Sequence, residues 1–254
     1  MQCVILAGGL GTRMAPYTDR VPKALLPVAG RPFADWQLTW LAAEGVDEVV
    51  YLIGHLGDEI KRFVGSGEQW GLKVRYVDEG VNLRGTGGAL RQALEQSALA
   101  AQFLVLYGDS YLSVDIRRVW DAFVAGGYPA LMTVYLNEGQ WERSNAAFSG
   151  GKVTRYEKGL SDIPDEMRYV DYGLSVLERS TVRQWMPPEI VLDLADTFTQ
   201  LSAAGKLAGF EAGERFYEIG SPEGLRDLEE RLRSCLAPGL SSPGDEALTR
   251  RDTH

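Results

Sequence analysis

The feature that most constrains this chain is a buried strand that runs directly into a glycine-rich loop near the N-terminus. Residues Gln2–Ala7 form a short, continuous, mostly apolar run that Gly8-Gly9 ends. The loop continues as Leu10-Gly11-Thr12-Arg13. Glycines let backbone N–H groups approach phosphate oxygens closely, and arginine adds a planar cationic fork. The segment therefore indicates a phosphate-binding loop, with a plain tight turn as the alternative.

Two better-known phosphate loops do not fit this segment. No Gly-x-x-x-x-Gly-Lys-Ser/Thr occurs in the chain, which excludes a P-loop. Met14 stands where the dinucleotide fingerprint requires glycine or alanine, and the next expected strand ends in Ile53-Gly54-His55, without an acid for a ribose hydroxyl. Both departures argue against an NAD-dependent dehydrogenase, the natural competitor.

Apolar runs alternate with amphipathic stretches through the first 140 residues. This alternation predicts parallel strands joined by right-handed helical crossovers. The expected strands are Gln2–Ala7, Glu48–Ile53, Lys73–Val77, Phe103–Tyr107 and Ala130–Leu136. The expected helices are Phe33–Glu44, Asp58–Val64, Thr86–Ser97 and Val114–Ala125.

The pattern changes after about residue 140, where short strands with turns replace the alternation. These are expected at Ala146–Phe148, Lys152–Tyr156, Tyr169–Leu177 and Ala208–Glu211, with helices at Glu189–Ala203 and Ser221–Cys235. Ser221-Pro222-Glu223 is a typical helix start, with serine as the N-cap and proline at the first helical position. We expect an α/β fold, a mostly parallel open sheet flanked by helices with a small β-rich extension, as one domain over 1–236. Residues 237–254 are rich in Ser, Pro, Gly and charge and are expected to be disordered.

Composition excludes several classes of function. The net charge of −9 argues against a general nucleic-acid binder, although a few cations in a pocket suffice for a small anionic substrate. Two histidines in 254 residues give poor support to histidine triads or histidine-rich metal sites. No apolar run approaches the ~20 residues of a membrane helix, and the N-terminus lacks a basic leader. We therefore expect a cytoplasmic protein with no membrane or nucleic-acid partner.

A second segment, Pro22-Lys23-Ala24-Leu25-Leu26-Pro27-Val28, follows the loop after a short spacer. Together with Leu6–Arg13, it resembles the sugar-1-phosphate nucleotidyltransferase (NDP-sugar pyrophosphorylase) family over roughly residues 1 to 235. The likeness is nearest to the heptose- and mannose-1-phosphate guanylyltransferases. It implies a Rossmann-like nucleotidyltransferase fold, with a nucleotide-binding half over 1–140 and a sugar-binding half over 141–236. It also implies a Mg²⁺-dependent enzyme of nucleotide-sugar biosynthesis that joins a nucleoside triphosphate to a sugar 1-phosphate and releases pyrophosphate.

The resemblance assigns the nucleotide to two glycine-rich segments. In the family, the first loop and the lysine wrap and neutralise the triphosphate, and a later helix start lies near the base and ribose. The residues carried over are Leu6, Ala7, Gly8, Gly9, Gly11, Thr12, Arg13 and Lys23 for the triphosphate, and Gly85, Thr86 and Gly88 for the base and ribose. Arg13, Lys23 and Asp109 are the expected catalytic residues. For the second segment, a helix start that needs glycine for packing is the alternative.

The metal is expected on two carboxylates. Asp109 ends the apolar strand Phe103–Tyr107 at the carboxyl edge, where open α/β sheets place ligands. The family's Gly-Asp at this point binds the metal, and a turn-forming aspartate is the alternative. Glu218 stands in Glu218-Ile219-Gly220-Ser221, where relatives carry an aspartate, and is the candidate second ligand. Magnesium takes one or two carboxylates and several waters.

The sugar phosphate is expected beside a strand end in the second half. In the family, a Glu-Lys pair binds it, which assigns Lys158 to the phosphate and Glu157 to a hydroxyl, with a common surface pair as the alternative. Asn145 and Asp171 are further candidates. Lys158 would hold the nucleophile, and an ionised phosphate needs no general base.

The substrate best matching the motifs is GTP with a heptose or mannose 1-phosphate. The alternatives are a uridylyl-, thymidylyl- or cytidylyltransferase acting on another sugar 1-phosphate or on an alcohol phosphate. A non-catalytic nucleotide sensor would be expected to lack Arg13, Lys23 or Asp109, yet all three are present. A homo-oligomer is compatible with the resemblance.

Overall fold

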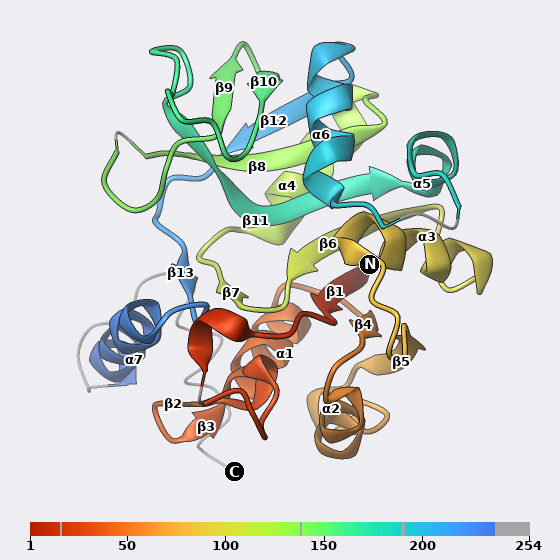
Figure 1. Cartoon of the computed structure of the whole chain (residues 1–254), viewed down its shortest axis with the longest axis vertical. Helices are drawn as coiled ribbons and strands as arrows, with labels where there is room; N and C mark the ends of the chain where they lie inside the picture. The colour runs from red at the N-terminus through yellow and green to blue at the C-terminus, as the bar shows by residue number, and fades with distance from the viewer. Residues whose placement is uncertain (16, 138, 189–190, 237–254) are drawn as a thin grey trace.

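The computed structural model describes residues 1–15, 17–137, 139–188 and 191–236 (Figure 1). The predicted disordered tail, residues 237–254, lies outside the described residues. Strands from both halves of the chain form one nine-stranded sheet with the order β5-β4-β1-β6-β11-β8-β12-β10-β9. The bounds are β1 Gln2–Ala7, β4 Glu48–Ile53, β5 Lys73–Asp78, β6 Gln102–Tyr107, β8 Ala130–Leu136, β9 Ala146–Ser149, β10 Lys152–Tyr156, β11 Tyr169–Glu178 and β12 Leu207–Glu211.

The predicted α/β sheet flanked by helices is confirmed, and its pairing is mixed. β5, β4, β1 and β6 are parallel, as the alternation predicts. The expectation that Ala130–Leu136 continues this parallel series is wrong at one point, because β11 lies between β6 and β8 and pairs antiparallel with both. Ser175 of β11 is in register with Val105 on one side and Met132 on the other. This long-range insertion has no local signal in the sequence.

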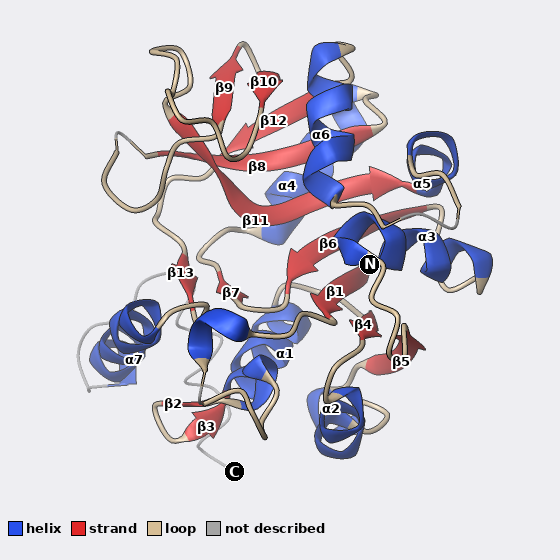
Figure 2. Cartoon of the chain, in the orientation of Figure 1, coloured by secondary structure: helices blue, strands red, loops and turns tan. Residues whose placement is uncertain are grey.

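Helices cover both faces of the sheet (Figure 2). Side chains alternate along a strand, so Cys3 and Ile5 of β1 join one core while Val4 joins the other. The first core packs against α1 Phe33–Ala43, α2 Gly57–Val64 and α4 Ile116–Gly126. The second packs against α3 Gly85–Glu95, α5 Arg179–Trp185 and α6 Leu194–Ala203. No helix in the described ranges has the length and apolar character to cross a bilayer.

Two helix predictions in the second half need correction. The sequence pattern did not predict α5, and the expected helix Glu189–Ala203 begins later, at Leu194. Asp193 ends the preceding extended segment, because its side chain accepts a hydrogen bond from Ala195 N and so caps the helix. Residues 189–190 lie outside the described ranges.

The closing helix and two small sheets complete the molecule beside the main sheet. α7 spans Pro222–Leu236, and Ser221 Oγ accepts from Gly224 N at 3.0 Å, which confirms the predicted start. One small sheet pairs β2 Pro27–Val28 with β3 Arg31–Pro32. The other pairs β7 Ser110–Tyr111 with β13 Tyr217–Glu218. The remaining elements are the short 3₁₀ helices η1 Thr12–Met14, η2 Lys23–Leu25 and η3 Glu68–Trp70.

Candidate active site

The carboxyl ends of β1 and β6 place the glycine loop beside Asp109. The two strands are parallel neighbours with Leu6 opposite Tyr107, and Gly108 N donates to Leu6 O at 3.0 Å. A Cβ atom on Gly108 would lie 2.5 Å from that carbonyl oxygen, so this approach requires glycine. Residues more than 100 positions apart therefore meet at one sheet edge, as the strand-end argument predicted for Asp109.

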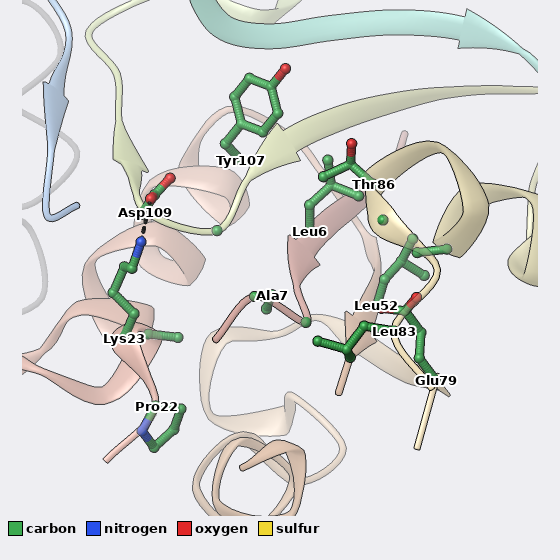
Figure 3. Close-up of a pocket in the computed structure, with 16 residues that line it drawn as sticks. Leu6, Ala7, Pro22, Lys23, Leu52, Glu79, Leu83, Thr86, Tyr107 and Asp109 are labelled. Atoms are coloured by element: carbon green, nitrogen blue, oxygen red, sulfur yellow. Dashed lines mark hydrogen bonds and ion pairs between the residues drawn. The ribbon is translucent and has the colours of Figure 1, made fainter. Parts of the chain in front are cut away.

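A pocket of about 250 Å³ opens at this edge, and we call it the glycine-loop pocket. Eight of the residues predicted from the sequence line it: Leu6, Ala7, Gly8, Gly9, Lys23, Gly85, Thr86 and Asp109. Lys23 Nζ donates to Asp109 Oδ2 at 2.8 Å on one side of Ala7 (Figure 3). Leu52, Leu83 and Glu79 lie on the other side. The pocket thus has a charged end and an end with apolar walls.

A second pocket, also of about 250 Å³, shares Tyr107 and Asp109 with the first. We call it the Lys158 pocket. Six of the residues predicted from the sequence line it: Arg13, Asp109, Asn145, Lys158, Asp171 and Glu218. The residues expected to bind the two substrates thus fall mainly into two pockets that meet at one carboxylate.

Glu218 reaches Asp109 through the small sheet. The register of β13 on β7 sets Glu218 opposite Ser110, and Ile219 N donates to Asp109 O at 2.9 Å. Burial raises the pKa of Glu218, and the Asp109 charge raises it further, while Arg13 and Lys23 lower it. Arg13 lies 3.8 Å from the Glu218 carboxylate and is otherwise largely exposed. The two carboxylates are therefore close enough to repel each other.

Asp171 lies at the centre of a hydrogen-bond network in the Lys158 pocket. Its Oδ2 accepts from Tyr107 Oη at 3.0 Å and from Tyr156 Oη at 3.2 Å. Its backbone N–H donates to Asn145 Oδ1 at 2.9 Å. The Lys158 ammonium lies 5.3 Å from the Tyr107 ring centroid and 6.0 Å from that of Tyr156. Asn145 and the two tyrosines hold Asp171, and Lys158 lies over their rings.

Four predicted residues, Gly11, Thr12, Gly88 and Glu157, lie outside the lining of both pockets. Gly11 has a φ of +66° and turns the loop toward Thr18, whose Oγ1 donates to Gly11 O. Thr12, which follows it, is exposed. Glu157 pairs with Arg155 at 2.9 Å on the surface.

The glycines at the start of α3 make room for another segment of the chain. Leu192 O accepts from Gly87 N at 2.9 Å and from Gly88 N at 3.2 Å. A Cβ on Gly85, which has a φ of +73°, would lie 2.6 Å from the same oxygen. Thr86 Oγ1 donates to Asp193. Close packing against Leu192 therefore accounts for glycine at position 85, which also lines the glycine-loop pocket, whereas Gly88 lines neither pocket.

Among the lining residues that sequence reasoning missed, Tyr107, Glu79 and Glu142 carry polar side chains. Tyr107 is the last residue of β6 and Glu79 directly follows β5, so the strand-end rule that found Asp109 could have found them too. Glu142 lines the Lys158 pocket from the loop between β8 and β9. Burial raises the pKa of Glu142, and the Glu218 charge raises it further. No pattern in the sequence marks Glu142.

Residues 3–210 match the MobA-like NTP transferase domain family, and the chain belongs to this family. The match runs from β1 to β12 and includes the glycine loop, Lys23, Asp109, Lys158 and Asp171. The predicted enzyme class, a nucleotidyltransferase, is therefore confirmed.

Several of its relatives by sequence are named as nucleotidyltransferases of sugar 1-phosphates. The chain is 28% identical over 239 residues to the D-glycero-α-D-manno-heptose 1-phosphate guanylyltransferase of Aneurinibacillus thermoaerophilus, covering 93% of this chain and 100% of that protein. It is 40% identical over 137 residues to an N-acetylmuramate α-1-phosphate uridylyltransferase of Neisseria meningitidis, covering 54% of this chain and 58% of that protein. The Caulobacter vibrioides protein of the same name is 28% identical over 90% of this chain and 96% of its own length.

Solved structures show the same fold. A putative glucose-1-phosphate thymidylyltransferase from Bacillus anthracis superimposes with a TM-score of 0.80 at 21% identity, covering 97% of this chain and 99% of that one. HddC from Yersinia pseudotuberculosis, complexed with GMP-PN, gives a TM-score of 0.72 at 24% identity, covering 91% of this chain and 99% of that one. At these identities the likeness is one of fold.

Proposed function

We propose that this chain transfers a nucleoside monophosphate from a nucleoside triphosphate to a sugar 1-phosphate and releases pyrophosphate. The observation that carries the proposal is that the glycine-loop pocket and the Lys158 pocket meet at Tyr107 and Asp109. Two substrates bound in these pockets would have their phosphates near the shared wall. Holding two reactants in line can supply much of the rate enhancement without a covalent intermediate.

Different positively charged groups would bind the two substrates. Backbone N–H groups of Gly8 and Gly9 and the Lys23 ammonium would bind the triphosphate, and Arg13 would stabilise charge on the departing pyrophosphate. Lys158, over the Tyr107 ring, would hold the phosphate of the sugar substrate. An oxygen of that phosphate attacks the α-phosphorus of the triphosphate, the bond from the α-phosphorus to the bridging oxygen of pyrophosphate breaks, and pyrophosphate leaves.

Asp109 and Glu218 fit a magnesium ion as the cofactor. The described residues contain no cluster of three or more Asp, Glu, His or Cys suited to a metal. Magnesium does not need one, because it takes one or two carboxylates and completes its shell with water and substrate phosphates. Burial raises the pKa of Glu218 and the Asp109 charge raises it further, so a cation bound between the two carboxylates would favour their ionised forms. When bound, the ion would neutralise phosphate charge.

We propose GTP and a heptose or mannose 1-phosphate as the substrate pair. Support comes from the heptose 1-phosphate guanylyltransferase that matches over its whole length. The Caulobacter uridylyltransferase matches at the same identity over nearly as much of the chain. UTP with N-acetylmuramate 1-phosphate is therefore the second candidate. In either case Asp171 would accept hydrogen bonds from sugar hydroxyls.

The test is a matrix of GTP, UTP, dTTP, CTP and ATP against several sugar 1-phosphates, followed by pyrophosphate release with and without Mg²⁺. Asp109→Asn should lower kcat by about 10²–10³-fold, the loss typical when one charge-stabilising group is removed, with an unchanged Tm. Asp58→Asn, on the exposed surface of α2, is the matched control and should keep full activity. Nucleotide binding without pyrophosphate release for any pair would refute the proposed transfer to a sugar 1-phosphate, and full activity of Asp109→Asn would remove Asp109 from the site.

A further inference from the structure

Gln37 is a fully buried glutamine of α1 that contacts the turn carrying Asp109. Its side-chain Nε2 donates to Ser110 O at 2.8 Å and to Tyr107 O at 3.2 Å. These two carbonyl groups stand on either side of the Gly108-Asp109 pair. A primary amide carries two N–H donors on one nitrogen, so one side chain can bond both carbonyls. Gln37 therefore ties both ends of the Asp109 turn to a helix that lies at least 70 positions earlier in the chain.

Two further hydrogen bonds hold the same turn from other directions. Gly108 N donates to Leu6 O at 3.0 Å, and Ile219 N donates to Asp109 O at 2.9 Å. The Asp109 carboxylate in turn accepts from Lys23 Nζ at 2.8 Å. The backbone of the turn is thus fixed by β1, by the residue after β13 and by α1. These bonds decide where the Asp109 carboxylate lies between the two pockets.

The amide at position 37 has a cost in stability that an apolar side chain would not have. Gln37 Oε1 is buried, and none of the residues that the structure describes donates a hydrogen bond to it. An unpaired buried acceptor destabilises a folded chain. The adjacent residues of the helix, Trp36 and Leu38, are buried and apolar. A side chain that only filled this space would be apolar too, so the two donated bonds explain the glutamine and packing does not.

We propose that Gln37 is a positioning residue for Asp109, which holds the backbone on both sides of that aspartate and so keeps its carboxylate at the wall shared by the two pockets. This inference rests on the proposed function, in which Asp109 acts on the reacting phosphates through a bound cation. Gln37 lines neither pocket, so it acts only through Asp109. Removing a group that orients a metal ligand typically lowers activity about 10- to 100-fold.

The first experiment compares Gln37→Met with the wild type on one accepted substrate pair. Methionine is unbranched like glutamine but has no donor, so both bonds to the turn are lost. We expect kcat to fall about 10- to 100-fold. The KM for each substrate should stay unchanged, because no residue that lines a pocket is altered. A Gln37→Met protein that folds and keeps the wild-type kcat would overturn the proposal.

Gln2→Met is the matched control. Gln2 is also buried and bonds backbone groups, with Nε2 donating to Ala98 O at 3.1 Å and Oε1 accepting from Ala100 N at 2.8 Å. It is the first residue of β1, so it lies at the strand end opposite the site. The Tm should fall in both variants, whereas kcat should fall only in Gln37→Met. An equal loss of kcat in the two variants would be a general effect of a lost buried amide and would overturn the proposal.

The route through Asp109 is tested in the Asp109→Asn background. There, Gln37→Met should lower kcat further by about two-fold at most, because the carboxylate that Gln37 positions is already absent. A loss by the same factor in both backgrounds would mean that Gln37 acts independently of Asp109 and would overturn the proposal. If Gln37→Met does not fold, Gln37→His, which keeps one N–H donor, takes its place. Its loss of kcat should be smaller and should also disappear in the Asp109→Asn background.

Hydrogen exchange separates this inference from the proposed function, because it needs no substrate and no turnover. The amides of Gly108 and Ile219 are hydrogen-bonded within and against the turn, so they report on its order. Exchange in peptides that span these two amides should be faster in Gln37→Met than in the wild type and in Gln2→Met. Faster exchange would support the role of Gln37 even if no substrate pair released pyrophosphate. Unchanged exchange would refute that role and leave the transfer reaction intact.

Discussion

The start of α3 provides a test of why this chain has a glycine at position 85. Gly85 has a φ of +73°, and a Cβ there would lie 2.6 Å from the backbone oxygen of Leu192. Gly85→Ala therefore introduces two separate penalties. One is the left-handed backbone, which any L-residue disfavours, and the other is a contact that only movement of the Leu192 segment can relieve.

The size of the effect follows from these two penalties. The left-handed conformation costs about 1–2 kcal/mol for a residue with a side chain. Displacing Leu192 O strains the bonds it accepts from Gly87 N and Gly88 N, at about 0.5–1.5 kcal/mol each. The sum is a loss of roughly 2–5 kcal/mol in unfolding free energy, and about 3 °C per kcal/mol converts it to a Tm lower by roughly 6–15 °C.

The assay is thermal unfolding of Gly85→Ala beside Gly127→Ala. Gly127 ends α4 with a φ of +65°, and a Cβ there meets nothing within 4 Å. The control therefore carries only the backbone strain of about 1–2 kcal/mol, or roughly 3–6 °C. Equal Tm losses in the two variants would refute the argument that Leu192 requires glycine at position 85.

Two further predictions concern the sugar side and pH. The Arg215 guanidinium lies 3.6 Å from the Trp141 ring centroid and 4.4 Å from that of Tyr217, so it fastens the loop after β8 to β13. Arg215→Ala should raise the KM for the sugar 1-phosphate about two- to thirty-fold, as expected for the loss of a cation–π contact. The KM for the triphosphate should stay unchanged. Steady-state kinetics in which both KM values rise by the same factor would contradict this prediction. Burial raises the pKa of Glu44, whose Oε2 accepts from Ile116 N, above its ordinary 4.5. The stability that protonated Glu44 contributes is therefore full below its unfolded pKa and is lost as the pH rises through its folded pKa. In urea unfolding from pH 4 to 7, the unfolding free energy of Glu44→Gln should therefore rise relative to that of the wild type. A difference between the two proteins that stays constant with pH would contradict this prediction.

The local sequence was sufficient to predict the first half of the fold and the residues at the charged end of the glycine-loop pocket. A short apolar run followed by glycine predicts a strand and its end, and parallel strands place their ends at one edge. That argument located the loop after β1 and Asp109, and the two-part motif added Lys23. The same argument applies to Tyr107, the last residue of β6, and to Glu79, the residue directly after β5.

Only the tertiary structure decided how the two halves combine. β11 inserts between β6 and β8 and brings Asp171 to the hydroxyl groups of Tyr107 and Tyr156, a pairing set by contacts far apart in the sequence. The same holds for Glu218, which the pairing of β13 with β7 carries to Asp109. Such register depends on which hydrophobic faces become buried together, and a linear pattern does not encode that choice.

The glycines at the start of α3 show the limit of reading chemistry from a motif. From the sequence, Gly85 and Gly88 could serve a ligand or the packing of the chain. The structure places the Leu192 carbonyl against Gly85, so close backbone approach explains the glycine at that position, while Gly85 and Thr86 both line the glycine-loop pocket. A glycine in the sequence can indicate that another group packs closely against the backbone, because any other residue would place a Cβ atom in that space. Only the tertiary structure shows which group that is.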